Sequence, residues 1–202
     1  GDPAHPRASG LRTRAGLITE IWDGEAPPGL EGRVVDLGGA TVLPGLVDAH
    51  LHLRGIGAAD RQLRLQGTAS KAEVLAKVAE AATAAPPGAW IRGRGWDQND
   101  WPEAAFPTAA DLDAVAGENP VWLTRIDGHA VWVNSKALAL AGVVASTVDP
   151  DGGRLLRNAA GVPTGVAIDN AIDLLAGQLP ESSPEEIREE LLRGQALCHA
   201  VG

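Results

Sequence analysis

Two histidines separated by a single residue are the feature of this sequence with the clearest chemical meaning. His50 and His52 lie in the segment LPGLVDAHLHL, residues 43–53, in which the residues alternating with them are apolar. On a β-strand, residues two apart point to the same side, so Asp48, His50 and His52 would share one face. Two neutral imidazoles on one face can bind a single ion such as Zn²⁺. The segment therefore predicts a strand over residues 46–53 that presents two metal ligands.

A His-x-His pair alone is weak evidence for a metal site, because most surface or core histidines simply have their ring nitrogens satisfied by hydrogen bonds. Three neighbouring features make this pattern more specific: Pro44 and Gly45 before the strand, Asp48 two residues before the first histidine, and the apolar back face. The hypothesis requires both rings to lie on the same side of the backbone and near an opening.

Composition and charge restrict the classes of function. The chain has 202 residues, 45% hydrophobic and 21% charged, which is typical of one or two folded, soluble domains. Its formal net charge of -9, without a Lys/Arg cluster, argues against nucleic-acid and anionic-membrane partners. No apolar run approaches the ~18 residues of a membrane span and no signal peptide opens the chain, so a cytoplasmic location is the default expectation. The single cysteine, Cys198, excludes an internal disulfide.

Local signals predict strands that alternate with helices. Helices are expected after the N-cap residues Ser70, Thr108, Ser135 and Ser183, over residues 71–85, 109–116, 136–141 and 184–200, with a further one near 170–176. Strands are expected over residues 15–22, 34–37, 90–95, 121–126 and 165–168. This order favours an α/β fold of parallel β/α units preceded by a smaller β part, with the division near Pro44.

Four segments occur in an order that resembles one family. They are VLPGLVDAHLHL, WIRGRGWDQNDWPEAAFPTAADLDAV, RIDGHAVWVNSKAL and GVPTGVAIDNAIDL. Together they resemble the amidohydrolase superfamily, in its YtcJ-like branch (amidohydrolase family 3), which includes an N-substituted formamide deformylase. The resemblance covers essentially the whole chain. It implies that residues 1–44 form part of a small composite β-sandwich and residues 45–202 roughly the first half of a TIM-like (β/α)8 barrel.

The resemblance implies a metal-dependent hydrolase that cleaves carbon–nitrogen bonds other than peptide bonds in a small amide or formamide substrate. His50 and His52 match the family's metal-binding pair, which holds one or two divalent ions, often zinc, that activate water. Asp48 would orient one of these histidines or be a buried carboxylate held by backbone donors. Asp169, at a strand end, is a further candidate metal ligand, with a helix N-cap as the alternative. A carbamylated-lysine bridge is not expected, because the three lysines all lie in predicted helices.

Two other segments follow predicted strands, and the resemblance places them at the substrate pocket. Trp96 would pack on the substrate while Asp97 holds the loop, or Trp96 would only cover the end of the barrel. Asp127 and His129 are the candidate catalytic pair. The histidine would contact the substrate or orient a transition-state oxygen, and the alternative is a loop histidine bonded to Asp127.

The chain is expected to be an incomplete portion of an enzyme, inactive alone, because a (β/α)8 barrel takes ~250 residues. It begins at Gly1 and contains no methionine, which suggests a processed product or part of a longer protein. The family's later histidines and acid/base aspartate would lie beyond Gly202, since His199 belongs to the last predicted helix. The rest of the barrel would be another chain or a further segment, or a homo-oligomer would cover the strand edges. The alternatives are a non-catalytic relative or interaction module, and a cyclic amidohydrolase related to hydantoinase or dihydroorotase.

Overall fold

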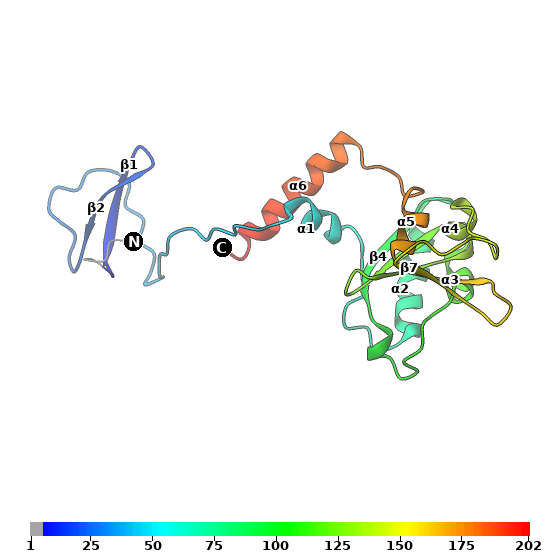
Figure 1. Ribbon diagram of the computed structural model, residues 1–202. Helices are drawn as coiled ribbons and strands as arrows, with labels where there is room; N and C mark the ends of the chain where they lie inside the picture. The colour runs from blue at the N-terminus through cyan, green and yellow to red at the C-terminus, as the bar shows by residue number, and fades with distance from the viewer. Residues whose placement is uncertain (1–5) are drawn as a thin grey trace. The chain divides into compact units, whose positions relative to one another are not determined.

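The computed structural model describes residues 6–202, which form two compact units (Figure 1). The first unit ends at Ala49, and the second extends from His50 to Val201. The boundary between the units lies shortly after Pro44, near which the sequence predicts a division. The predicted metal-binding segment therefore spans the junction of the two units.

The first unit contains one antiparallel hairpin, formed by β1 (Gly10–Arg14) and β2 (Leu17–Trp22). Its turn residues, Ala15 and Gly16, both have positive φ (51° and 78°), as in the tight turns that match the twist of paired strands. The predicted strand over residues 15–22 therefore starts too early, because the turn occupies its first two positions. The strand predicted over residues 34–37 does not form. Among the described residues, the sheet of the first unit therefore has two strands, β1 and β2.

The second unit is built on a six-stranded mixed sheet in the order β3-β4-β5-β6-β8-β7. Its strands are β3 (Leu63–Arg64), β4 (Ile91–Trp96), β5 (Val121–Arg125), β6 (Ala130–Val133), β7 (Gly153–Arg157) and β8 (Pro163–Asp169). The first three pair in parallel, and the others in antiparallel. The expected parallel β/α arrangement is thus wrong beyond β5, because residues 126–129 are too short a connection for a crossover to a parallel neighbour.

The α/β class is confirmed, but the sheet of the described residues is open and no closed barrel is seen. β3 and β7 form its two edges. Barrel closure requires the two edge strands to pair with each other. Only β3, β4 and β5 have the parallel pairing of a (β/α) barrel.

Side-chain caps define the helix starts. The three helices with the predicted caps are α2 (Lys71–Ala84) after Ser70, α3 (Ala109–Ala116) after Thr108 and α6 (Pro184–His199) after Ser183. The shorter ones are α4 (Ser135–Leu140) and α5 (Asp173–Ala176). Asn134, one residue before the predicted cap Ser135, caps α4, since its side chain accepts the N–H of Ala137 at 3.1 Å. Within residues 6–202, no helix combines the length and apolar character required to cross a membrane.

Helices cover both faces of the sheet and hold its strand ends in place. One face packs against α2 and α3 around Trp96, Trp101 and Trp132, whose indole rings contact one another. The other face buries Val131 and Val133 against residues of α4 and α5. This two-sided core fixes the carboxyl ends of β4, β5 and β8, where the candidate site residues lie.

A separate helix pair follows the histidine segment. α1 (Leu53–Asp60) begins directly after His52 and packs against α6 (Figure 1). Two glycines allow the backbones to approach closely. A Cβ added to Gly57 would lie 1.7 Å from the carbonyl oxygen of Glu190, and one added to Gly194 would lie 2.3 Å from that of Leu53. An ion pair between Arg54 and Glu190, at 2.7 Å, reinforces this contact.

Candidate functional site

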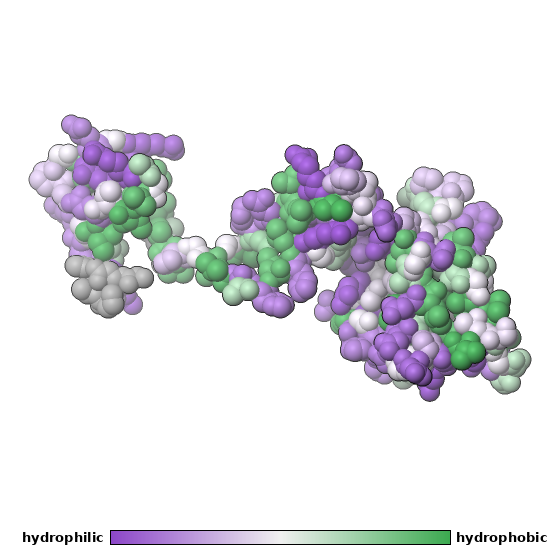
Figure 2. Space-filling view, turned by 45° about the horizontal axis from the view of Figure 1, so that its top comes forward, coloured by the Kyte–Doolittle hydropathy of each residue, from purple (hydrophilic) through white to green (hydrophobic). Residues whose placement is uncertain are grey.

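The segment before α1 does not form the predicted strand. Residues 41–52 have no strand conformation, and α1 begins at Leu53, the last residue of the predicted strand. A strand needs a hydrogen-bonded neighbour, and none of the described strands pairs with this segment. Its apolar residues are consequently exposed, and hydrophobic surface is visible along it in Figure 2. Asp48 is exposed as well, so its interpretation as a buried carboxylate is wrong.

His50 and His52 nevertheless lie close together and exposed. Their ring centroids are 5.4 Å apart with the planes tilted by 60°. With a Zn–N distance of ~2.1 Å, two imidazoles on a tetrahedral ion would have their centroids roughly 5 Å apart. The centroid separation of the pair is therefore close to that of two imidazoles on one such ion. A structural or catalytic zinc takes at least three protein ligands, and residues 6–202 contain no group of three His, Cys, Asp or Glu side chains that could hold a metal.

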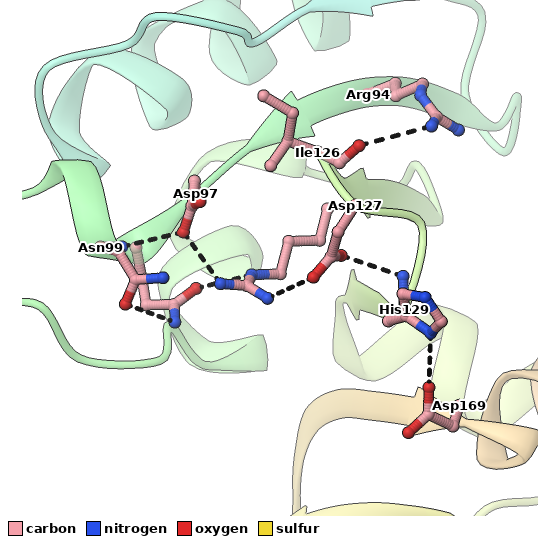
Figure 3. A network of polar contacts seen from close by, with 9 residues as sticks. Arg94, Asp97, Asn99, Ile126, Asp127, His129 and Asp169 are labelled. Atoms are coloured by element: carbon pink, nitrogen blue, oxygen red, sulfur yellow. Dashed lines mark hydrogen bonds and ion pairs between the residues drawn. The ribbon is translucent and has the colours of Figure 1, made fainter.

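The other predicted site residues converge at the carboxyl ends of the strands (Figure 3). Asp97 follows β4 directly, Asp127 follows β5, and Asp169 is the last residue of β8. β4 and β5 are adjacent and parallel, so their carboxyl ends meet at the same edge of the sheet. The sequence thus identified the carboxylates that the fold assembles.

Arg125, the last residue of β5, connects these carboxylates and was not predicted. Its Nη2 donates to Oδ1 of Asp97 at 3.0 Å, and its Nη1 donates to Oδ2 of Asp127 at 2.6 Å. Its Nε donates to Oε1 of the buried Gln98 at 3.0 Å. The arginine side chain is only 16% exposed. All three guanidinium nitrogens are therefore used in one planar fork.

Burial and hydrogen bonding act in opposite directions on Asp97. Burial, the largest single effect, raises its pKa. The backbone N–H of Asn99 and the guanidinium of Arg125 donate to the carboxylate and together outweigh burial, so the pKa of Asp97 lies below its usual value. Asp97 therefore stays ionised at neutral pH, and its side chain accepts the backbone N–H of Asn99 in the loop after β4.

Asp127 extends the network to His129. Its Oδ1 accepts the backbone N–H of His129 at 2.9 Å, across the turn residue Gly128 with a φ of 80°. This contact matches the alternative reading of a loop histidine bonded to Asp127. The same histidine makes a second contact, because Nδ1 of its ring lies 2.8 Å from Oδ1 of Asp169.

Strand pairing explains why His129 meets Asp169. β6 and β8 are antiparallel, with Ala130 opposite Ile168, so the residues just outside this pair face each other. The N–H of Asp169 also donates to the carbonyl of His129 at 2.9 Å. Asp169 precedes a short 3₁₀ helix (Asn170–Ile172), but its side chain makes no cap hydrogen bond there. Its φ of 48°, unfavourable for a non-glycine residue, is held by this pairing.

The contact with Asp169 orients the His129 ring. A carboxylate only accepts hydrogen bonds, so a bond from the neutral ring to the carboxylate form of Asp169 requires the proton on Nδ1. In the neutral ring, Nε2 then carries the lone pair. The His129 side chain is 74% exposed and that of Asp169 47%. The hydrogen-bond network is thus largely shielded from solvent around Arg125 and exposed to solvent at the imidazole of His129.

Trp96 lies in the core. It is fully buried, and its indole N–H donates to the carbonyl oxygen of Leu123 at 2.8 Å. The ring therefore packs within the fold, which is nearer to the alternative prediction, in which Trp96 only covers the end of the barrel, than to a contact with substrate. His199 is in the last turn of α6, as predicted.

Sequence reasoning missed Arg125 and Gln98 as parts of the site. The available signal was the charge of Arg125 at the end of an apolar strand, close to two carboxylates that need a cation. Gln98, beside Asp97 in the sequence, is 5% exposed and accepts from Arg125.

Comparison with known structures supports the fold. An uncharacterized metal-dependent hydrolase from Pyrococcus furiosus superposes with a TM-score of 0.55 at 24% sequence identity. The match covers 79% of this chain and 30% of that one. At this identity the likeness shows a shared fold.

Sequence relatives extend over most of the chain. Protein LONG AFTER FAR-RED 3 of Arabidopsis thaliana is 38% identical and the putative amidohydrolase YtcJ of Bacillus subtilis is also 38% identical, over 95% and 85% of this chain. An N-substituted formamide deformylase of Arthrobacter pascens is 36% identical over 79% of it. The chain spans about a third of the length of each of these relatives (33%, 32% and 29%).

A family model for the amidohydrolase family (Amidohydro_3) matches residues 33–202. This range includes the histidine pair and every residue of the network around Arg125. The chain therefore belongs to amidohydrolase family 3.

Proposed function

We propose that this chain supplies part of the active site of a metal-dependent hydrolase that cleaves carbon–nitrogen bonds other than peptide bonds in amides or formamides. The observation that carries the proposal is the oriented His129 ring, held by Asp169 at the carboxyl ends of the strands. The relative named as a formamide deformylase supports this reaction class. Because the chain spans about a third of its relatives, the activity is proposed for the complete protein. There, residues 45–202 would contribute to a TIM-like barrel.

In the complete protein, His50 and His52 would hold a divalent ion, with zinc proposed from their nitrogen donors. When bound, such an ion supplies Lewis acidity, which polarises a carbonyl and lowers the pKa of water. Further ligands would come from the part of the complete protein that this chain does not include. Asp169 is proposed as the positioning residue of His129, since its Oδ1 already contacts that ring. This contact supports orientation of the imidazole more than the predicted role in metal binding.

His129 is the residue of this chain proposed to contact the substrate. Its Nε2 would hydrogen-bond the amide group, while Nδ1 stays on Asp169. Asp127 shapes the turn that carries the ring, through the backbone N–H of His129. Asp97 fixes the neighbouring loop. The exposed imidazole leaves room for a small molecule to approach.

Turnover by the complete protein tests the proposed function. Purified protein is incubated with a panel of N-formyl amines and simple amides, with and without added Zn²⁺, and after chelator treatment. Release of free amine that chelation abolishes and metal restores is expected. A complete protein that purifies without metal and hydrolyses none of these compounds even with added Zn²⁺ would support the alternative of a non-catalytic relative. Residues 1–202 alone are expected to show no turnover.

Replacing both histidines of the pair with alanine is expected to remove bound metal from the complete protein. Each imidazole contributes one ligand, and losing two of the usual three or more leaves no stable site. Metal content per chain, measured by mass spectrometry after dialysis, checks this result. The control is His199→Ala, at the exposed end of α6. Unchanged metal content in the His50→Ala/His52→Ala variant would show that the pair is not a metal site.

A further inference from the structure

Arg125 makes more hydrogen bonds than neutralising the two neighbouring carboxylates would require. Each of its three side-chain nitrogens donates to a different residue, namely Gln98, Asp97 and Asp127. The fork joins the loop after β4 to the loop after β5. These loops follow adjacent parallel strands.

Asp127 is shared between Arg125 and His129. Its Oδ2 accepts from Arg125 at 2.6 Å, and its Oδ1 accepts from the backbone N–H of His129 at 2.9 Å. Arg125 therefore fixes the carboxylate that in turn fixes the turn over residues 127–129. With the turn fixed, the ring of His129 points to Asp169.

The guanidinium also separates two negative charges. Asp97 and Asp127 both accept from it, through Nη2 and Nη1 respectively. Without the cation these carboxylates would repel each other across a sheltered space, and Asp127 would turn toward solvent. The turn would then lose the acceptor for the N–H of His129.

We propose that Arg125 is a positioning residue that sets the orientation of the His129 imidazole through Asp127. The inference rests on the proposed function for its catalytic consequence, but its structural part stands on the contacts of Arg125 alone. If Arg125 only stabilised the fold, replacing it would lower the free energy of unfolding without changing the tautomer of the His129 ring.

Imidazole nitrogen spectroscopy of this chain tests the structural part. In protein labelled with ¹⁵N at histidine and held at alkaline pH, the neutral His129 ring is expected to be protonated at Nδ1. In Arg125→Met the ring is expected to sample both tautomers. Arg125→Lys keeps the charge but replaces the three-way fork with a single ammonium, so an intermediate mixture is expected, and this variant decides the matter if Arg125→Met does not fold.

Arg157→Met is the matched control. Arg157 is another arginine with several partners, because it donates to the carbonyl oxygens of Ala145, Thr147 and Gly161 and pairs with Asp149. Its loss is expected to lower stability and leave the His129 tautomer unchanged. A folded Arg125→Lys or Arg125→Met protein with the wild-type His129 tautomer would overturn the proposal.

A double-mutant cycle in the complete protein tests the catalytic part. Arg125→Met is expected to lower kcat by about 10–100-fold with little change in KM, as for residues that orient a catalytic group. In the His129→Asn background the same change is expected to cost less than about 2-fold, because the residue through which Arg125 acts is gone. If Arg125→Met lowered kcat equally in the wild-type and His129→Asn backgrounds, Arg125 would not act through His129, and the proposal would be overturned. If the wild-type protein has no hydrolase activity, the proposed function fails, and the tautomer measurement alone decides the role of Arg125.

Discussion

His129→Asn is expected to lower kcat of the complete enzyme by about 10²–10⁴-fold, the usual contribution of a positioned general acid or base. Asparagine can keep a polar side chain at this site, but it has no titratable nitrogen to exchange a proton with the substrate. KM is expected to change much less, since proton transfer to Nε2 matters in the transition state and not in substrate binding. Steady-state kinetics on the substrate found in the turnover panel measure both constants.

Two further variants serve as comparisons for the effect of His129→Asn on kcat. Asp169→Asn keeps the histidine but weakens its orientation, so a loss of about 10–100-fold in kcat is expected. His199→Asn, on the exposed end of α6, is expected to leave kcat unchanged. If His129→Asn lowers kcat by less than about 3-fold, well below the contribution of a general acid or base, then His129 is a loop residue with only structural contacts to Asp127 and Asp169.

Gly57→Ala and Gly55→Ala are expected to change the free energy of unfolding in opposite directions. The two glycines are two positions apart in α1. A methyl group at Gly57 would collide with the backbone of α6 at Glu190, whereas one at Gly55 would have only an ordinary contact of 3.7 Å with His52. Overpacking at Gly57 is expected to cost about 1–3 kcal/mol. At Gly55, alanine is expected to gain up to ~1 kcal/mol of helix propensity.

Urea unfolding of each variant measures these differences. Gly194→Ala, on the other side of the contact, is expected to behave like Gly57→Ala, because its added methyl group would meet the carbonyl of Leu53. A Gly57→Ala protein that is as stable as Gly55→Ala would show that α1 and α6 do not pack through these residues.

The helices of the second unit were predictable because their signals are local. Ser70 and Ser183 each precede a helix and accept a backbone N–H of its first turn, and the hydroxyl of Thr108 donates to the carboxylate of Asp111 in the first turn of α3. The strands β4, β5 and β8 were predicted from equally local patterns. The direction of β6 was not, because it depends on which neighbour the chain reaches after a short connection. The segment at residues 46–53 shows the same limit, since its apolar alternation becomes a strand only beside a partner strand.

The candidate site was predictable in its residue types and only partly in its connections. Asp97, Asp127, His129 and Asp169 were identified as single positions following strands. Their grouping through Arg125 depends on the parallel pairing of β4 with β5, which no local pattern reveals. Trp96 illustrates the converse error, because a tryptophan near a pocket and one in a core have the same local sequence.

The packing of α1 on α6 has a consequence for the order of events during protein synthesis. Arg54 and Glu190, which pair across this contact, are 136 residues apart in the chain. A ribosome must therefore make the entire intervening sheet before α6 emerges to meet α1. Contacts between such distant segments form late because closing a long loop costs entropy. The helix that follows the histidine pair is thus expected to wait, without its partner, until translation of this region is nearly finished.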